Sequence, residues 1–421
     1  MFDPFRKMIR LSTTFTLLLA FRWTSFVLSQ EAEANTQNLA VRTIEDGGFG
    51  CKTNLYSWSM ESFKDQLYIG TLNIKGKALG MNLFLFGQPV FTKGAQVHRG
   101  TRASDGTWTW EEVLTNGLTT KKNYGIRKLI TIGDYLYGVT GNHETGFEVL
   151  QTSDGDTWTS VNEPGFGNVK NISGRGMASF KGYLYIGVEN RSEGAQVWRH
   201  KIETDGSLST DSDWEQVLEN GIDDDNNTWF SDFLVYNDGD EEYMYSGTLN
   251  ENGGQLWRTN GDFWENIFRE GNGNPSDTAL MKLVLFNNRI YIGTMNFQEG
   301  ASLLVSEDER ATSFKTLFTK GNGNPDNVYM WYMIEFESRL YVGTFHQFGR
   351  QEFDLFSSAD PETDGFIVET DDAFGLAKNM FGIRSMKVFD NRLIIGGASN
   401  NKPTKVFEAS SNVAARSSDL I

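Results

Sequence analysis

FKGYLYIG, residues 180–187, is the stretch that decides the fold of this chain. An apolar run ends at Phe180, the pair Lys181-Gly182 is a two-residue turn signal, and a second apolar run follows, which together predict an antiparallel β-hairpin. The second run recurs seven times at intervals of about 54 residues, a spacing longer than that of most helical repeats. Its seven copies are residues 67–70, 136–139, 184–187, 244–247, 291–293, 341–343 and 394–396.

Two further strands follow the hairpin in the most regular copies. Residues 194–199, GAQVWR, are predicted as a third strand, and similar stretches occur at 94–99 and 254–258. A turn and a fourth strand come next, as in residues 153–158, SDGDTW. Four short antiparallel strands, repeated at this length, are typical of the blades of a β-propeller.

The two ends of the chain complete one repeat between them. The seventh copy has a third strand near residues 404–407 but only a short polar segment after it. Residues 41–50, VRTIEDGGFG, match the fourth strand and loop of another copy, residues 264–273. Such a closure removes the exposed sheet edges. The sequence therefore predicts an all-β, seven-bladed β-propeller over residues 39–410, closed by its N-terminal strand, with a C-terminal tail at 411–421.

The turns before the fourth strands resemble a known motif. Residues 104–108, SDGTW, residues 153–158 and, more weakly, residues 260–264 are similar to the Asp box of sialidase-like propellers. Over residues 39–410 the chain resembles secreted seven-bladed β-propeller repeat proteins with Asp-box-like turns. The resemblance implies that the box Asp caps backbone amides and that its Trp packs between blades. It implies no activity.

The N-terminus has the pattern of a secretory signal. Three basic residues precede an apolar run at 11–21, and small residues follow at Val27 and Ser29. Arg22 ends the run well short of the ~20 residues that a spanning helix needs, which disfavours a signal anchor. We expect a signal peptide at residues 1–29, a linker at 30–38, a secreted, extracellular protein and no membrane span after cleavage.

The charge of the chain restricts its partners. The net charge is −17, and removal of residues 1–29 would leave 34 Lys and Arg against 54 Asp and Glu. Such a surface repels nucleic acids and anionic membranes. Cys51 is the one cysteine of the sequence, so no internal disulfide can form. We expect a monomer that binds no nucleic acid.

Glycine and asparagine mark the loops that should share one face of the propeller. The loops after the second strands begin with Asn73, Asn142, Asn190, Asn250, Asn296, His346 and Ser399. These residues either supply positive φ and side-chain caps to tight turns, or form a ring that binds calcium or sugar hydroxyls. The acidic runs at 223–226 and 238–242 lack the full spacing of a calcium loop. We therefore expect no cofactor or metal, with Ca²⁺ as the one cation considered.

One column of residues at the start of the first strands carries the candidate binding site. Read from blade one to blade seven, it consists of Trp58, Arg127, Arg175, Ser231, Met281, Trp331 and Arg384. If these positions face the channel, Trp331, Arg384, Trp58, Arg127 and Arg175 form a continuous ligand-binding arc. Guanidinium groups bind carboxylates or sulfates, and indoles stack on sugars or cations. Alternatively, each Arg pairs with an acid such as Glu61, Asp232 or Glu335, or lies between sheets.

Two other features lie near this arc. The blade-one loop, residues 74–93, is long and apolar, and is interpreted as a lid, a partner-binding element or a flap over a neighbouring blade. Three sequons predict a glycoprotein with acceptors at Asn171, Asn190 and Asn226. Glycans at the first two would lie close to the arc.

The function follows from these observations only in outline. The sequence has no zinc signature, phosphate-binding loop or nucleophile elbow, and no catalytic residue is assigned. We expect an extracellular binding propeller that recognises a glycan, an anionic small molecule or a protein through its loop face. The alternative is a sialidase-like hydrolase or lyase acting on an anionic glycan. The Arg-Ile-Pro segment that sialidases carry near their start is missing, because Arg42 is followed by Thr43.

Overall fold

Short antiparallel strands dominate the chain. The computed structural model describes residues 39–75, 88–222, 224–346, 352–370, 373–376 and 378–411, all within the unit Gln37–Ile421. The predicted signal peptide at 1–29 and the linker at 30–38 lie outside the described residues. So do residues 76–87 of the blade-one loop and residues 412–421 of the tail.

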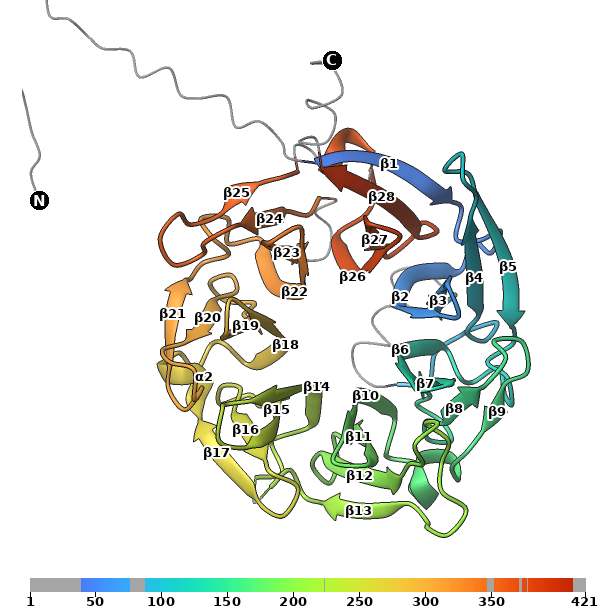
Figure 1. Ribbon diagram of the computed structural model, residues 1–421, viewed down its shortest axis with the longest axis horizontal. Helices are drawn as coiled ribbons and strands as arrows, with labels where there is room; N and C mark the ends of the chain where they lie inside the picture. The colour runs from blue at the N-terminus through green and yellow to red at the C-terminus, as the bar shows by residue number, and fades with distance from the viewer. Residues whose placement is uncertain are drawn as a thin grey trace, which may run out of the picture. The chain divides into compact units, whose positions relative to one another are not determined.

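The described strands form seven groups of four, the blades of a β-propeller (Figure 1). Blade one contains β2 (Asn54–Phe63), β3 (Gln66–Asn73), β4 (Val97–Arg102) and β5 (Trp108–Leu114). Blade two contains β6 (Gly125–Ile132), β7 (Tyr135–Gly141), β8 (Val149–Thr152) and β9 (Thr159–Ser160). Blade three contains β10 (Ser173–Phe180), β11 (Tyr183–Glu189), β12 (Gln196–Lys201) and β13 (Glu215–Leu218).

The second half of the ring repeats this order. Blade four contains β14 (Trp229–Asn237), β15 (Glu242–Leu249), β16 (Leu256–Thr259) and β17 (Trp264–Phe268). Blade five contains β18 (Ala279–Phe286), β19 (Arg289–Met295), β20 (Leu303–Ser306) and β21 (Phe314–Phe318). Blade six contains β22 (Asn327–Phe336), β23 (Arg339–His346), β24 (Leu355–Ser358) and β25 (Ile367–Val368). Blade seven contains β26 (Gly382–Phe389), β27 (Arg392–Ala398), β28 (Lys405–Ser411) and β1 (Leu39–Asp46).

Three single helical turns, η1 (Pro164–Gly167), α2 (Glu270–Gly273) and η2 (Ala373–Gly375), lie in loops between blades. Each contains residues with positive φ, such as Gly165 at 60° and Asn272 at 57°. This backbone conformation agrees with the turn role predicted for the loop glycines and asparagines.

One backbone hydrogen bond joins every pair of neighbouring blades. The amide of the last residue of each second strand, or of the residue directly after it, donates to a carbonyl at or just before the start of the next blade's first strand, as from Asn190 to Thr228 at 3.0 Å. The seventh bond, from Ser399 N to Leu55 O at 2.9 Å, joins blade seven to blade one. The seven donors are the asparagine, histidine and serine column predicted from the sequence: Asn73, Asn142, Asn190, Asn250, Asn296, His346 and Ser399.

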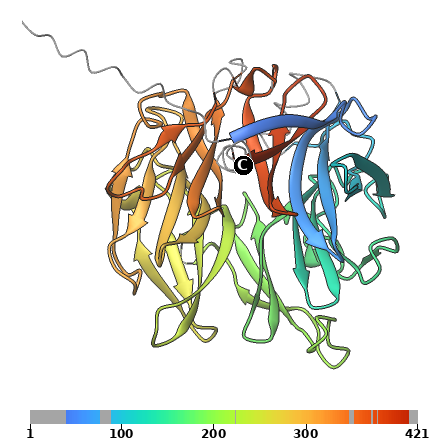
Figure 2. The ribbon, with the colours of Figure 1, turned by 45° about the horizontal axis from the view of Figure 1, so that its top comes forward.

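The N-terminal strand closes the ring, as the sequence predicts. β1 pairs antiparallel with β28, from Leu39 opposite Ser411 to Asp46 opposite Lys405, and Figures 1 and 2 both show the blue strand beside the red one. The buried carboxylate of Glu408 on β28 binds Arg42 of β1 at 2.9 Å and the Trp108 indole N–H of blade one at 2.7 Å. One carboxylate thus connects both ends of the chain with the first blade.

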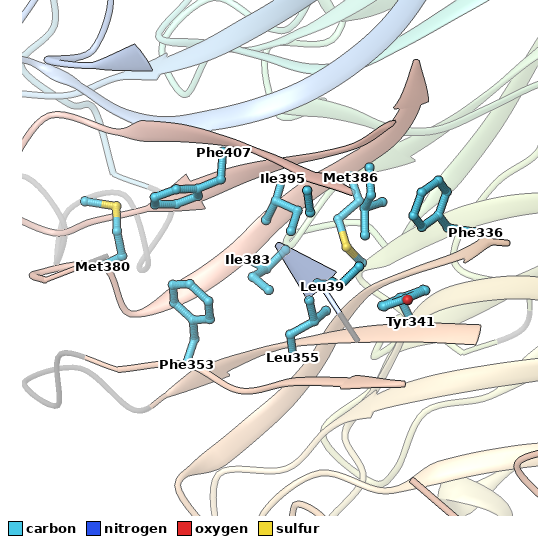
Figure 3. Close-up of a cluster of buried hydrophobic side chains, with 12 residues drawn as sticks. Leu39, Phe336, Tyr341, Phe353, Leu355, Met380, Ile383, Met386, Ile395 and Phe407 are labelled. Atoms are coloured by element: carbon cyan, nitrogen blue, oxygen red, sulfur yellow. The ribbon is translucent and has the colours of Figure 1, made fainter. Parts of the chain in front are cut away.

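The core lies between the blades. Figure 3 shows the cluster between blades six and seven, where Leu39 of β1 packs with Phe336, Leu355, Ile383 and Phe407. Because each sheet is covered on both faces by its neighbours, burial of apolar surface couples all seven blades.

The Asp-box-like turns are structural. Asp154 accepts hydrogen bonds from the amides of Asp156 and Thr157 at 2.8 and 2.7 Å, and Trp158 packs against Phe63 and Tyr68 of blade one. The sequence indicates such turns in three blades, but the structure has an equivalent cap in six. The caps are Asp105, Asp154, Asp205, Asn260, Asp308 and Asp360. Blade seven has no such turn because its third and fourth strands come from opposite ends of the chain.

Candidate functional site

Every innermost strand has a β-bulge at the column predicted to face the channel. In blade one the register shifts between Ser57 and Ser59, so that Trp58 is the extra residue, and Arg127 occupies the same place in blade two. The other five innermost strands shift at equivalent positions. A bulge re-aims the side chain of its extra residue. The backbone therefore singles out this column in all seven blades.

A pocket of about 600 Å³, which we call the loop-face pocket, lies at the loop end of the channel. The five candidate residues Trp58, Arg127, Arg175, Trp331 and Arg384 all line it, as does Met281. A second space of about 520 Å³, the inner channel, continues from the same six residues and is also lined by Ser231. The prediction that the column faces the channel is confirmed. Whether the five residues bind a ligand stays a prediction.

Each arginine of the arc lies over the ring of a tryptophan. The Arg384 guanidinium lies 5.0 Å from the ring centroid of Trp331 and 5.9 Å from that of Trp58. The Arg127 guanidinium lies 4.7 Å from the ring centroid of Trp58. Arg175 lies 3.5 Å from the ring of Trp229, which the sequence analysis did not select. Cation–π contacts of this kind hold each guanidinium in a fixed place.

Space for one of these indoles comes from a glycine in the next blade. A Cβ added to Gly125 would lie 1.9 Å from an atom of the Trp58 ring, so no larger residue fits there without moving the indole. Gly125 stands two residues before Arg127 in β6. The same strand thus provides both the cation and the room for the aromatic side chain beside it.

One buried carboxylate, Glu189, holds three arginines. It binds Arg175 Nε at 2.7 Å and Arg191 Nε at 2.7 Å, and lies 3.9 Å from Arg127 Nη1. Burial alone would raise the pKa of Glu189, but the three positive charges hold the pKa well below its usual range. The alternative that the arginines pair with Glu61, Asp232 or Glu335 is wrong in its partners. Arg127 and Arg175 do pair, but with an acid of blade three.

Arg384 differs from the other arginines of the arc. It makes no hydrogen bond or ion pair with any described residue, and its buried Nε is without a partner there. Burial, together with the positive charge of Arg175, lowers the pKa of Arg384 to about 10, so that the side chain remains charged at neutral pH. A second buried donor of the pocket lining, Nε1 of Trp229, likewise has no hydrogen-bond partner in the described chain.

The inner channel contains cations that are compensated. Asp232 binds Lys128 Nζ at 2.6 Å and Lys282 Nζ at 2.5 Å, and Glu61 binds Lys387. Although burial opposes ionisation, the two lysines lower the pKa of Asp232 to about 2. Asp232 and Glu189 are therefore both ionised at neutral pH, and neither holds a proton for a leaving group. Glu335 is exposed on β22, outside both linings.

The C-terminal part of the blade-one loop reaches the pocket wall at Gln88. The Gln88 carbonyl lies 2.7 Å from Nδ1 of His143, which lines the loop-face pocket, and Nε2 of His143 lies 2.8 Å from the Tyr124 hydroxyl. Burial lowers the pKa of His143 to about 4, so the ring is neutral at pH 7. Nδ1–H then donates to Gln88, and Nε2 accepts from Tyr124.

The loop asparagines serve the fold. Asn54 donates to the Gly48 carbonyl at 3.0 Å and accepts from Asn73 at 2.8 Å, and corresponding pairs occur in other blades. These bonds support the interpretation as turn caps rather than ligands. Among the residues that the structure describes, no group of three or more His, Cys, Asp and Glu side chains could hold a metal ion.

Two predicted glycan acceptors have the wrong environment. Asn171 is fully buried and its Nδ2 donates to Gly165 O and Gln196 Oε1, both at 2.9 Å. Asn190 is also fully buried, and its Nδ2 donates to Asn171 Oδ1 at 2.9 Å. A glycan on either nitrogen would break these bonds, so both predictions are corrected. Asn226 is exposed and stays a predicted acceptor.

The sequence analysis missed Glu189, Arg191 and Trp229. Glu189 stands directly before the loop asparagine, where the other six blades have Leu72, Gly141, Leu249, Met295, Phe345 and Ala398. A single acid in a column of apolar residues and glycine was the available signal. Trp229 lies two residues before the column position, on the same side of its strand, where Tyr56 and Tyr329 also line the pocket.

One solved structure supports the fold, and two further neighbours, with TM-scores below 0.5, are similar but carry no argument. A protein of Bacteroides fragilis, provisionally assigned as a 6-phosphogluconolactonase, has a TM-score of 0.50 at 10% identity, over 80% of this chain and 97% of that chain. Its counterpart from Bacteroides uniformis has a TM-score of 0.49 at 10% identity, over 79% and 97%. The SapL1 lectin in complex with alpha methyl fucoside has a TM-score of 0.44 at 10% identity, over 76% and 97%. Such identities show the fold alone.

No family model and no curated protein matches the chain. Within the described ranges, no helix is long and apolar enough to span a bilayer.

Proposed function

We propose that this chain is a binding propeller that takes a small organic anion into the loop-face pocket. The observation that carries the proposal is Arg384, a partly buried cation between two indoles whose buried Nε is a hydrogen-bond donor that no described residue satisfies. Burying such a group without a partner costs free energy. An anion at this place would supply the missing acceptor and charge.

The charge of the surrounding pocket supports the same ligand class. Below the rim the lining contains four arginines, Arg127, Arg175, Arg191 and Arg384, but one carboxylate, Glu189. The exposed Asp225 and Glu251 lie at the rim. The chain as a whole carries a net charge of −17. A local excess of positive charge in an acidic protein favours an anion at this point of the surface.

The size of the pocket favours one of the three ligand classes predicted from the sequence. A volume of about 600 Å³ suits a small molecule, because most small-molecule sites measure roughly 300 to 1,000 Å³. A protein partner would need a broad surface rather than an enclosed site. The secreted location remains part of the proposal and rests on residues 1–29; N-terminal sequencing of the protein from the producing cells' medium tests it.

The test replaces Arg384 and measures anion binding by calorimetry. We expect wild type to bind at least one member of a panel of benzoate, 3-phenylpropionate, glucuronate, sulfate and phosphate. Arg384→Met should weaken that binding at least about tenfold, because a charge-assisted hydrogen bond contributes roughly 1.5 to 3 kcal/mol. Arg127 and Arg175 are less suitable, because the loss of either also removes one of the partners of Glu189.

Arg310→Met is the matched control. Arg310 is exposed, pairs with the exposed Asp240 and lies outside the pocket lining, so its loss should leave anion binding unchanged. Absence of binding to every anion of the panel, or equal binding by the Arg384→Met protein, would refute the proposal.

A further inference from the structure

The loop-face pocket has two unlike halves. Blades seven, two and three contribute Arg384, Arg127, Arg175, Arg191 and the carboxylate of Glu189. Blades four to six contribute mainly apolar side chains, among them Leu249, Met281, Met295, Phe297 and Phe345. The indoles of Trp58 and Trp331 lie on either side of Arg384. Trp331 of blade six lies where the two halves meet, and Trp58 of blade one lies within the charged half, between Arg384 and Arg127.

The apolar half is a continuous surface. Leu249, Met281 and Tyr329 pack together against the buried Met295 and Trp229. Tyr329 stacks on Phe345 with ring centroids 4.5 Å apart, and Phe297 meets the edge of Tyr329 at 5.3 Å. Phe297 is 42% exposed, at the mouth of the pocket. Apolar side chains that face an open pocket contribute to binding when a ligand removes them from water.

This half has little to offer a sugar. Leucine and phenylalanine side chains have no hydrogen-bond donor or acceptor, and the methionine thioether is a weak acceptor. A bound glycan would lose hydration of its hydroxyls here without replacement, which disfavours binding. Two residues on this surface carry a hydrogen-bond donor: Tyr329 has a hydroxyl, whose pKa burial raises so that it stays neutral, and Trp229 has an indole N–H without a partner in the described chain.

We infer that the ligand is an amphipathic organic anion, with an anionic group at Arg384 and an apolar or aromatic body against blades four to six. This inference rests on the proposed function and narrows it, because it excludes polyhydroxylated acids and glycans as the preferred class. The anionic group accepts from Arg384 Nε, while the body covers Met281 and Phe297. Electrostatic attraction and apolar burial then act on opposite ends of one molecule.

The test compares three probes by calorimetry: 3-phenylpropionate, glucuronate and the neutral 3-phenylpropionamide. We expect 3-phenylpropionate to bind at least about tenfold more tightly than glucuronate, because only its body gains from apolar burial. The amide should bind at least about tenfold more weakly than the acid, because it lacks the charge.

Two variants localise the effect. Met281→Gln keeps the size of the side chain and should weaken 3-phenylpropionate binding about fivefold while leaving glucuronate binding within about twofold. Phe297→Ala should also weaken 3-phenylpropionate binding, and it lies at the exposed mouth of the pocket, outside the core. Agreement between the two variants would therefore show that the effect of Met281→Gln is not due to a folding defect.

The outcomes separate the inference from the proposed function. Glucuronate binding as tight as 3-phenylpropionate, or binding of sulfate or phosphate without 3-phenylpropionate, would overturn the amphipathic ligand but leave an anion site. Equal binding of 3-phenylpropionate and 3-phenylpropionamide would show that charge does not contribute to binding. It would overturn both the proposed anion site and the amphipathic ligand. The absence of binding by any anion would likewise remove both.

Discussion

The loop-face pocket and the inner channel both contain partly buried cations, but each lysine named in the inner channel has an ion-pair partner, whereas Arg384 has none among the described residues. There, Asp232 binds Lys128 and Lys282, and Glu61 binds Lys387. In the pocket, Glu189 serves three arginines, and Arg384 has no ion pair with a described residue. The two regions share the bulged column but differ in charge balance.

This difference separates a structural role from a binding role. A compensated buried ion pair is costly to break and has nothing left to offer a ligand. An uncompensated buried cation lowers the stability of the empty protein and is retained where function needs it. We therefore expect mutations in the inner channel to change stability and mutations at Arg384 to change binding. The four predictions below test this contrast, from the largest expected effect to the smallest.

Asp232→Asn should cause the largest change, a loss in the free energy of unfolding. It leaves the partly buried Lys128 and Lys282 without their counter-charge, and removal of one partner from a buried pair costs about 3 to 5 kcal/mol. Urea unfolding followed by tryptophan fluorescence measures the loss. Asp240→Asn, in the exposed pair with Arg310, is the control and should change the free energy of unfolding by less than about 1 kcal/mol. Similar losses of unfolding free energy in Asp232→Asn and Asp240→Asn would show that the ion pairs of the inner channel have no special structural role.

Low pH should reduce the stability that the ion pairs of Asp232 give to the folded protein. The pKa of Asp232 is lowered to about 2 in the folded protein, so its ionised form favours folding. Its contribution, about 2.7 kcal/mol for a carboxyl whose unfolded pKa is near 4, is complete above about pH 5. It is lost as the pH falls through about 2.

The measurement is the difference in unfolding free energy between wild type and Asp232→Asn at several pH values. This difference should shrink by about 2 kcal/mol between pH 5 and pH 2, because Asp232 is almost fully protonated in the unfolded wild type at pH 2 and about half protonated in the folded protein. A difference that is independent of pH would contradict the prediction.

Arg384→Met should act in the opposite direction on stability. It removes an uncompensated cation and keeps an apolar side chain of similar length between the indoles, so we expect a gain of about 1 to 2 kcal/mol. Lys282→Met is the comparison in the inner channel and should lower stability, because Asp232 loses one of its two partners. Destabilisation by Arg384→Met comparable to that of Lys282→Met would show that Arg384 is structural.

Sulfate should give the smallest effect. If the anion occupies the loop-face pocket at several times its dissociation constant, it stabilises the folded protein by about 1 kcal/mol. Sulfate also stabilises proteins in general. The informative quantity is therefore the melting temperature of wild type minus that of Arg384→Met, in sulfate and in chloride of equal ionic strength. An equal rise in both proteins would count against the site.

Much of the fold could be predicted from the sequence because each blade repeats the same local signals. The hairpin turns, the box Asp154 and the loop asparagine Asn190 are short-range features, and their chemistry is the same wherever the repeat occurs. The closure was predictable too, because the last copy lacks a fourth strand and residues 41–50 match one. The caps in blades three, five and six escaped detection because Asp205, Asp308 and Asp360 stand in turns without the full motif.

The site was predictable only as a set of positions. Alignment of the repeats selects the column of Trp58, Arg127 and Arg384 because equivalent residues in a symmetric ring face the same channel. Alignment does not show which side chains meet across that channel, and so the partners Glu61, Asp232 and Glu335 were wrong. Nor does it show burial of a side chain, and the sequons at Asn171 and Asn190 therefore gave wrong glycan acceptors.

The sequence by itself determined the seven blades, their closure and the residues that surround the channel, because these depend on local turn chemistry and on strand register. Only the tertiary structure decided that Glu189 binds three arginines and that Arg384 binds none of the described carboxylates. The reason is physical. Charge pairing depends on distances of a few ångströms between side chains of different blades, which the β-bulges and the indoles of Trp58 and Trp331 fix after the ring has closed.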